Sequence, residues 1–169
     1  MSGLTKYYTS FIIAEIDFTV ISSASGIKEI IFNMNKRSEK LKTSVFVEPN
    51  DTNMYNIHLQ LTDYFKGERK VFNLPLEITG TEFQKKVWNE LLKIPYGETI
   101  SYKELAIRLE DEKVIRAAAH ANGVNPLPIV IPCHRVIGSN GSLVGYGGGL
   151  HIKAKLLQLE GSLEPDLFN

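Results

Sequence analysis

The strongest constraint on the fold lies in residues 81–123, where helix start and stop signals follow one another closely. Capping boxes occupy Thr81–Gln84 and Ser101–Glu104. In this motif a hydroxyl and a Glu or Gln side chain satisfy free backbone N–H groups at a helix start. The first helix is expected to end at Pro95–Gly97, and a third helix to run to about Asn122, with Gly123 as its stop. Short helices joined by a brief polar turn predict a helix-turn-helix, whose last helix is the recognition helix.

The first 80 residues have a different pattern, rich in β-branched and aromatic residues. Strands are predicted over Tyr7–Ile16, Phe18–Ser22 and Ile27–Asn33. A helix is predicted from Asn53, because apolar residues recur there with a helical period as far as a C-cap at Gly67. Val71–Ile78, around Pro75, is interpreted as a linker. No site motif occurs in this half, which favours a packing and support role.

These patterns predict an α/β (α+β) protein with two domains. Residues 1–78 would form a small mixed α/β support domain with antiparallel strands. Residues 79–169 would form a mostly helical, winged-helix-like domain containing the helix-turn-helix.

Composition excludes several classes of protein. The 19 Lys and Arg balance 19 Asp and Glu. The chain has no basic half or tail of the kind that would indicate a nucleic-acid binder. One Cys cannot build a disulfide scaffold, and a lone thiol fits a reducing compartment. The four His are scattered without ligand spacing, so we expect no metal. The start of the sequence is not typical of a signal peptide, and no apolar stretch is long enough to span a bilayer. We therefore expect a soluble protein without membrane contact, cytoplasmic or, in a eukaryote, nuclear.

The predicted recognition helix carries one long cation among methyl groups, over Arg116–Ala121 (RAAAHA). Alanines are good helix formers, and this face could simply pack against a neighbouring helix. Alternatively, small side chains let the helix approach a DNA groove closely while Arg116 projects into it. The helix alone does not decide between these interpretations.

The most informative segment is Asn125–Val136 (NPLPIVIPCHRV). Its three prolines argue against a helix and predict a stiff, extended run. A lone Cys in an apolar strand is usually inert, but His134 and Arg135 follow Cys133 directly, and such residues are seldom buried unless paired. Successive side chains of an extended chain point to opposite faces, so a bridging water would be needed for His134 to take the thiol proton. Glu160 is a carboxylate that could orient His134, although spacing alone does not select it.

The run Pro132–Val136, preceded by Asn125-Pro126, resembles the active-site signature of the O6-alkylguanine-DNA alkyltransferases, and the similarity extends from about Thr81 to Gly161. The resemblance implies that Cys133 accepts the alkyl group, that His134 is its base through water and that Glu160 orients the histidine. It further implies that Asn125 braces the neighbouring turn and that Tyr102 donates a proton or hydrogen bond to the guanine ring. Arg116 would fill the gap left by the flipped nucleotide.

Further residues are assigned by the same resemblance. The predicted DNA contacts besides Arg116 are Tyr102, Ala117, Ala119, Ala121 and Arg135. The predicted substrate pocket is formed by Val136, Tyr146, Gly147, Pro128 and Asn122, with the Gly147 amide facing O6. Asn122 and Gly147 stand where many relatives carry an apolar residue and a Ser, and they bear on the size of alkyl group that the pocket accepts.

The implied activity is direct-reversal DNA repair by a methylated-DNA–protein-cysteine methyltransferase. A flipped O6-alkylguanine in double-stranded DNA, approached through the minor groove, would lose its alkyl group to Cys133. The resulting thioether cannot undergo thiol exchange, so each chain would act once. We further expect it to act as a monomer and without a cofactor. The alternatives are a non-enzymatic protein that binds alkylated DNA and a winged-helix transcription regulator. A thiol peptidase is disfavoured, because adjacent Cys and His do not meet directly and no oxyanion device is evident.

Overall fold

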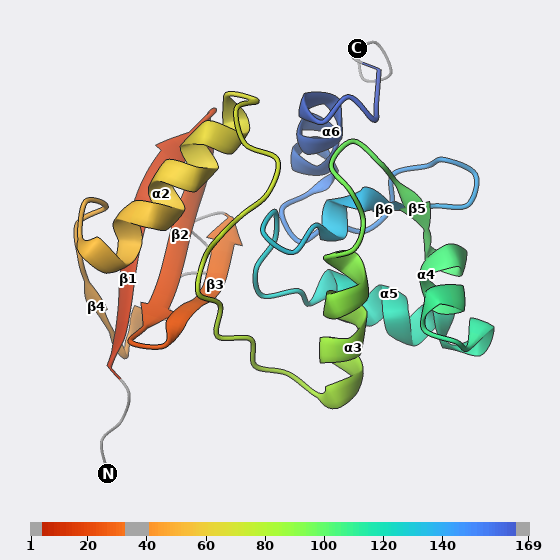
Figure 1. Ribbon diagram of the computed structural model, residues 1–169, viewed down its shortest axis with the longest axis horizontal. Helices are drawn as coiled ribbons and strands as arrows, with labels where there is room; N and C mark the ends of the chain where they lie inside the picture. The colour runs from red at the N-terminus through yellow and green to blue at the C-terminus, as the bar shows by residue number, and fades with distance from the viewer. Residues whose placement is uncertain (1–4, 33–40, 165–169) are drawn as a thin grey trace. The chain divides into compact units, whose positions relative to one another are not determined.

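The computed structural model describes residues 5–32 and 41–164, apart from the side chains of residues 52 and 53. The chain divides into two compact units, Met1–Thr79 and Gly80–Asn169, which are coloured red to yellow and green to blue in Figure 1. The α/β class is confirmed, with a four-stranded sheet and a helix in the first unit and a mostly helical second unit.

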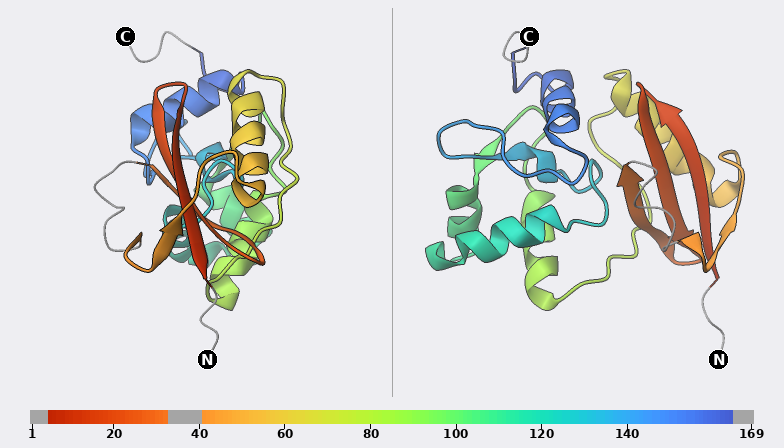
Figure 2. Two further views of the ribbon diagram at one scale, coloured as in Figure 1. Left: turned by 90° about the vertical axis from the view of Figure 1, so that its left-hand side faces the viewer. Right: turned by 180° about the vertical axis from the view of Figure 1, so that it is seen from behind.

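The first unit is a four-stranded sheet covered on one face by a helix (Figures 1 and 2). The strands are β1 (Lys6–Ile13), β2 (Ile16–Ser23), β3 (Gly26–Phe32) and β4 (Ser44–Phe46), and the helix is α2 (Thr52–Phe65). The sheet order is β3-β2-β1-β4. The first three strands are antiparallel, as predicted, whereas β4 pairs in parallel with β1.

The first predicted strand ends earlier in the structure than expected. The strand predicted to reach Ile16 ends at Ile13, because Ala14 and Glu15 form the hairpin turn with φ of 51° and 65°. Such a two-residue turn with positive φ matches the twist of the flanking strands, but neither residue is the Asn or Gly that normally signals it. The predicted strand end at residue 33 lies outside the described residues.

The core of this unit is aromatic. Phe18 on β2 is fully buried, with its ring centroid 5.5 Å from that of Phe32 and 5.9 Å from that of Phe65. Tyr64, in the last turn of α2, is also fully buried and contacts the ring of Phe72 at 5.5 Å. Offset and edge contacts of this kind add to the gain from burying apolar area, and they hold α2 on the sheet.

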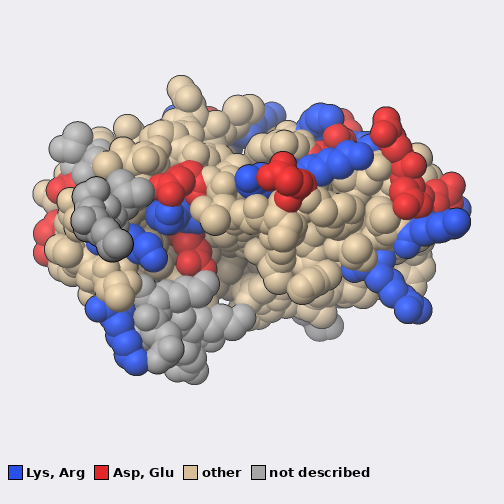
Figure 3. Space-filling model, turned by 90° about the horizontal axis from the view of Figure 1, so that it is seen from below, with Lys and Arg blue, Asp and Glu red and all other residues tan. Residues whose placement is uncertain are grey.

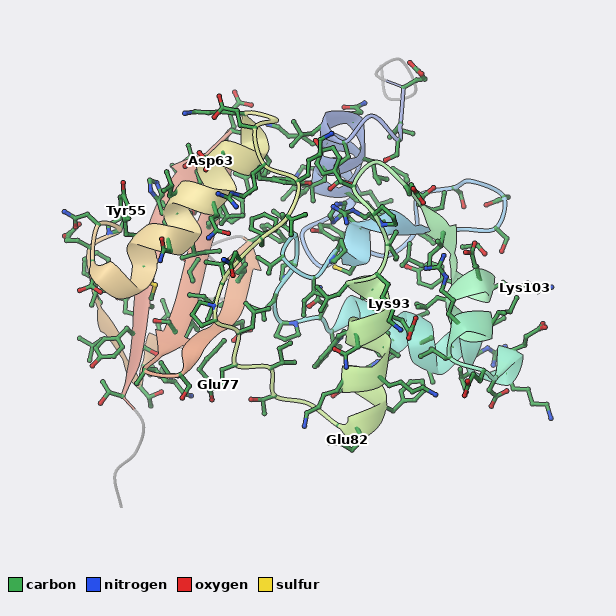
Figure 4. The ribbon with its side chains drawn as sticks, in the orientation of Figure 1. Tyr55, Asp63, Glu77, Glu82, Lys93 and Lys103 are labelled. Atoms are coloured by element: carbon green, nitrogen blue, oxygen red, sulfur yellow. The ribbon has the colours of Figure 1, made fainter. Side chains whose placement is uncertain are left out.

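The segment expected to be a linker is attached to β3. Ile27 donates its N–H to Pro75 O at 2.8 Å and accepts from Glu77 N at 2.8 Å. The Glu77 carboxylate also binds Ser23 and Lys28. Gly26 is required at this contact, because an added Cβ would lie 2.4 Å from Pro75 O. The end of the first unit is therefore fixed to its sheet (Glu77 is labelled in Figure 4).

The second unit contains four helices, α3 (Glu82–Leu91), α4 (Tyr102–Arg108), α5 (Ile115–Gly123) and α6 (Leu150–Leu159), among its described residues. Both bonds of the Thr81 capping box are present at the start of α3, where Figure 4 labels Glu82. At α4 the structure shows the first half of the predicted box, with Ser101 Oγ accepting from Glu104 N at 3.0 Å. The Glu104 carboxylate instead accepts from Arg108 at 2.6 Å.

The predicted helix-turn-helix is formed by α4 and α5, with a 3₁₀ turn at Glu112–Val114 between them. A hydrogen bond of 2.9 Å from Trp88 Nε1 to Ala121 O joins α3 to α5. Two short parallel strands, β5 (Ile100–Ser101) and β6 (Val136–Ile137), place the start of α4 beside the turn that carries Cys133. This pairing brings residues far apart in sequence to one site.

Candidate active site

The backbone that leads to Cys133 is a series of turns, so the predicted extended run is wrong. Ile131 N donates to Leu127 O at 2.8 Å, and Cys133–Arg135 form a 3₁₀ turn. Proline fixes only its own φ near −65°, a value that turns share with extended chain. The alternation expected for an extended chain therefore does not apply to Cys133 and His134.

Asn125 braces this turn from within. Its Oδ1 accepts from Leu127 N at 3.0 Å, and its Nδ2 donates to Ile131 O at 2.8 Å. Between these two bonds Ile129 has φ of 75° although it is β-branched and 1% exposed. Such a conformation costs on the order of 1–3 kcal/mol and persists only where the surroundings enforce it. The bonds made by Asn125 are part of that enforcement.

A buried carboxylate joins the two residues after Cys133. Glu160, the C-cap of α6, accepts from His134 Nε2 at 2.8 Å through Oε1. It also binds Arg135 in a bidentate ion pair, with Nε–Oε2 at 2.8 Å and Nη2–Oε1 at 2.9 Å. The structure thereby brings together His134 and Glu160, which spacing alone did not select. Bidentate pairing of this kind gives orientation as well as energy.

These contacts fix the proton on the imidazole. An ionised carboxylate can only accept, so neutral His134 carries its proton on Nε2 and a lone pair on Nδ1. Nδ1 is buried with no hydrogen-bond partner among the described residues. Burial lowers the pKa of His134, although the hydrogen bond to Glu160 opposes the shift. His134 is therefore an unprotonated base near neutral pH.

The charges of the cluster stabilise one another. Burial acts to raise the pKa of Glu160, but the hydrogen bonds from His134 and Arg135 outweigh it and hold that pKa well below its usual range. Arg135 is also fixed by a bond of 2.6 Å from Nη1 to Ile94 O. A permanent carboxylate at this position favours the imidazolium that would form when His134 takes a proton.

Cys133 is a buried free thiol in this structure. It is 4% exposed, and burial raises its pKa to about 11, against the opposing effects of the Asn125 side chain, the Lys153 ammonium and nearby backbone N–H groups. A thiol with this pKa is almost entirely protonated at neutral pH. Its reactivity therefore depends on a base that removes the proton during the reaction.

Lys153 is a functional candidate that sequence reasoning missed. It is fully buried on α6 and donates from Nζ to Val136 O at 2.6 Å and to Val144 O at 2.9 Å. Nζ also lies 6.0 Å from the centroid of the Tyr102 ring. Burial lowers the pKa of Lys153 to about 8, and the negative charge of a Cys133 thiolate opposes that shift. One feature of the sequence could have identified Lys153 as buried: it stands three residues before Leu156, on the apolar face of α6.

A mainly apolar cavity of about 560 Å³ lies between the helix-turn-helix and the loop before α6. Tyr102, Arg116 and Tyr146 line it, together with Ile115, Ala119, Gly123, Val144, Gly145 and Gly147. Tyr102 Oη donates to Val144 O at 3.4 Å. Burial raises the pKa of Tyr102, a nearby Cys133 thiolate raises it further, and a hydrogen bond from Asn122 opposes both effects. The phenol thus lies close enough to the thiol for their charges to interact.

The remaining predicted site residues fall into two groups. Arg116 and Ala117 are exposed on α5, and Ala119 is half-buried at the cavity. Arg135 and Ala121 are 6% and 2% exposed, so the prediction that these two side chains contact DNA is wrong. Arg135 is drawn inward by its ion pair with Glu160, and Ala121 lies on the face of α5 that packs against α3.

The predicted pocket residues are only partly at this cavity. Tyr146 and Gly147 line it, whereas Val136, Pro128 and Asn122 are buried and are not part of its lining. Val136 is held in β6, and Asn122 Nδ2 donates to Tyr102 Oη and to Cys133 O, at 3.4 Å each. The structure therefore does not place those three residues at this cavity.

The described residues contain no group of three or more His, Cys, Asp or Glu side chains that could hold a metal ion. None of the helices in the described ranges is long and apolar enough to cross a membrane. On the face seen in Figure 3, basic and acidic side chains lie interspersed, in keeping with the balanced composition.

Fold and site together define a helix-turn-helix protein that carries a lone thiol beside a histidine–carboxylate pair. Two family profiles cover most of the sequence: "6-O-methylguanine DNA methyltransferase, ribonuclease-like domain" matches residues 8–78, and the DNA binding domain of the same family matches residues 82–162. The chain belongs to the 6-O-methylguanine DNA methyltransferase family.

Individual relatives are similar over most of their length. A methylated-DNA–protein-cysteine methyltransferase of Methanosarcina acetivorans is 48% identical over 81% of this chain and 86% of its own. The inducible enzyme of that name from Bacillus subtilis is 39% identical over 92% and 90%. The crystal structure of the Mycobacterium tuberculosis O6-methylguanine methyltransferase has a TM-score of 0.86 at 36% identity, with 96% of each chain covered. A Mycobacterium tuberculosis structure in complex with DNA has a TM-score of 0.81 at 37% identity, covering 92% of this chain and 93% of that one.

Proposed function

We propose that the protein repairs DNA directly, by moving the alkyl group of O6-alkylguanine irreversibly to its own Cys133. The observation that carries this proposal is the buried arrangement of Cys133, His134 and Glu160, in which the lone thiol is followed by a neutral histidine whose tautomer is fixed by the carboxylate. The names of the relatives, methylated-DNA–protein-cysteine methyltransferases, give the same reaction class.

The reaction begins with removal of the thiol proton. His134 Nδ1 accepts it through one water molecule, and Glu160 stabilises the imidazolium. The sulfur then forms a bond to the alkyl carbon while the carbon–oxygen bond breaks, and the electron pair of that bond moves into the purine. Tyr102 donates its proton to a ring nitrogen and offsets this charge. The imidazolium of His134 then returns its proton to the Tyr102 phenolate through solvent. The net change is transfer of the alkyl group from oxygen to sulfur and of one proton from the thiol to the purine, which needs no further reactant.

Access to the alkylated base requires that it leave the duplex. The target oxygen is stacked inside DNA, and a side chain that fills the resulting gap lowers the cost of flipping. Arg116 is exposed on α5, where it lines the cavity. The side chains of Ala117 and Ala119 beside it are small, which allows the helix to approach DNA closely. We propose that this face enters the minor groove, with Arg116 in the gap and the flipped base in the cavity. The Mycobacterium tuberculosis structure in complex with DNA supports DNA binding as such.

The proposed site lies entirely within the second unit, so one chain can act as a monomer. The first unit would support the second without contributing reacting groups. A thiol that must stay reduced suits the cytoplasm or, in a eukaryote, the nucleus.

The test is transfer of a label from duplex DNA that carries radiolabelled O6-methylguanine. We expect at most one label per chain, and none with Cys133→Ala, which removes the one Cys in the sequence. Bound but unaltered DNA would instead favour a non-enzymatic alkylated-DNA-binding protein or a regulator.

Arg116→Ala tests the flipping role separately. This variant should slow repair of duplex DNA far more than reaction with free O6-benzylguanine, which needs no flipping. Equal losses on the two substrates would contradict the role given to Arg116.

A further inference from the structure

Two Asn-Gly pairs occur in the sequence, Asn122-Gly123 and Asn140-Gly141. In such a pair the backbone nitrogen of the glycine can attack the side-chain amide carbon of the asparagine, because glycine has no side chain to hinder the approach. The pair itself gives no reason to expect one site rather than the other. The structure places the two pairs in different surroundings, and these surroundings determine which pair can react.

The first pair is held in an unreactive conformation. Asn122 is buried, and Gly123 is the last residue of α5. The amide nitrogen of Asn122, which would have to leave as ammonia, donates to Tyr102 Oη and to Cys133 O, at 3.4 Å each. In an α-helix each backbone N–H also points toward the carbonyl four residues earlier, away from the preceding side chain. Reaction at this pair therefore requires the end of α5 to unfold.

The second pair lies in an exposed turn between β6 and the cavity wall. Residues 139–142 are all exposed. Gly141 N donates to Gly138 O at 2.9 Å, and Gly138 N donates to Ser142 O at 2.8 Å. No atom lies within 4 Å of the position that a Cβ of Gly141 would take, so no neighbouring group crowds this peptide. Exposed loops open at little cost in free energy, so Gly141 N can leave its carbonyl partner without disturbing the core.

The side chain of Asn140 is already folded back over the turn. Its Oδ1 accepts from Ser142 N at 3.1 Å and from Ser142 Oγ at 2.6 Å. A bond from an asparagine oxygen to the backbone N–H two residues later is an Asx turn, and it keeps the side-chain carbonyl beside the peptide of Gly141. Attack on this carbonyl places negative charge on Oδ1. Donors already aimed at such an oxygen stabilise the charge as it develops.

We propose that Asn140 is a site of spontaneous deamidation, promoted by the two donors of Ser142. Gly141 N loses its proton to solvent and forms a bond to Asn140 Cγ, and the side-chain amide nitrogen takes a proton from solvent and leaves as ammonia. Water then opens the five-membered imide at either carbonyl, which gives aspartate or isoaspartate. The net reaction consumes one water, releases one ammonia and adds one negative charge to the loop that leads to Val144 in the cavity wall. This inference does not depend on the proposed function.

The test follows both pairs in the folded protein, held at a mildly alkaline pH that favours loss of the amide proton. Trypsin places them in separate peptides, residues 117–135 and 136–153, because it cuts after Arg135. Mass spectrometry of these peptides measures the replacement of NH by O. Conversion at Asn140 should be at least about 10³-fold faster than at Asn122, which reacts only in the rare unfolded state. A sample unfolded in guanidinium chloride is the control, in which both pairs should convert.

Two variants test the contribution of Ser142. Ser142→Ala removes one of the two donors to Asn140 and should slow conversion there by about 2- to 12-fold, the range for one net hydrogen bond. Ser139→Ala makes the same chemical change on the other side of Asn140 and should keep the wild-type rate. A rate for Ser142→Ala that is unchanged or higher would overturn the role of Ser142. Equal conversion of the two pairs in the folded wild type, or an intact Asn140 once the unfolded sample has reacted, would overturn the site itself.

Discussion

Replacement of Glu160 by Gln tests how the buried cluster couples stability to reactivity. The carboxylate accepts four hydrogen bonds, from His134 Nε2, from Arg135 Nε and Nη2, and from Gly97 N at 3.3 Å. All four partners are donors, so an amide NH₂ group must face at least one of them. The variant therefore loses the ion pair and gains a donor–donor contact in a buried position.

The expected loss of stability follows from the burial of Arg135. Removing one partner of a buried ion pair leaves the other charge uncompensated and costs about 3–5 kcal/mol. With a urea m-value of about 1–3 kcal/mol/M, the unfolding midpoint should fall by at least about 1 M. The fluorescence of Trp88, the one Trp of the sequence and a residue of the second unit, reports this transition. Glu98→Gln, at an exposed position of the same unit, is the control and should shift the midpoint little.

The pH dependence has a definite sign. The folded-state pKa of Glu160 lies below its unfolded value, so its contribution is complete above about pH 4.3 and is lost as the pH falls from there toward the folded-state pKa. The lowered pKa of His134 adds a loss of stability that begins below about pH 6.5, because the unfolded state binds that proton more readily. The difference in stability between wild type and Glu160→Gln should therefore shrink as the pH is lowered below about 4.3.

Reactivity should fall as well. If the amide NH₂ faces His134, the imidazole must carry its proton on Nδ1 and loses the lone pair that accepts the thiol proton. General base catalysis contributes about 10²- to 10⁴-fold, so alkyl transfer from O6-benzylguanine should slow by that order in single-turnover measurements. A midpoint within about 0.3 M of the wild type, together with an unchanged transfer rate, would refute the coupling argued for this cluster.

Three other substitutions probe the surroundings of Cys133. Lys153→Met removes a charge that lowers the pKa of Cys133. The midpoint of the pH profile for alkylation of this single thiol by iodoacetamide should therefore rise. An unchanged midpoint would contradict the electrostatic contact. Asn125→Ala leaves Leu127 N–H without the partner shown here and removes one of the two bonds to Ile131 C=O, which still accepts from Cys133 N; it should cost about 1–3 kcal/mol in urea unfolding, with slower transfer to Cys133. Gly97→Ala forces a Cβ to within 2.9 Å of Glu160 O at φ of 82° and should cost about 1–3 kcal/mol, whereas a stable variant would show that this turn can relax.

Local signals explain which parts of the fold could be predicted from the sequence. The start of α3 and the helix-turn-helix followed from Thr81, Ser101 and Gly123, because caps and stops act within a few residues of chain. The α/β class followed from the contrast between β-branched segments and helical periods. The Ala14–Glu15 hairpin turn and the left-handed Ile129 were missed, because residues of these types rarely adopt positive φ and longer-range contacts impose it here.

Burial of charged side chains was the other limit of sequence reasoning. Arg135 was expected at the DNA surface, and Lys153 was not considered at all, yet both are buried. Each is buried because distant groups satisfy it: a carboxylate 25 residues away for Arg135, and the carbonyls of Val136 and Val144 for Lys153. A charged side chain is stable in the interior only where such partners exist. Sequence patterns carry no information about partners that only the fold brings together.

The turn at Cys133–Arg135 explains why the arginine has to follow the histidine. In a 3₁₀ turn successive side chains project about 120° apart, so one carboxylate at the end of α6 can meet both His134 and Arg135 while Cys133 points elsewhere. Arg135 supplies two parallel donors that hold both oxygens of Glu160, and only then is Oε1 fixed for the imidazole. A lysine, as a point charge, cannot hold both oxygens in this way. The orientation of His134, the proposed base for Cys133, therefore depends on a guanidinium that is not part of the cavity lining.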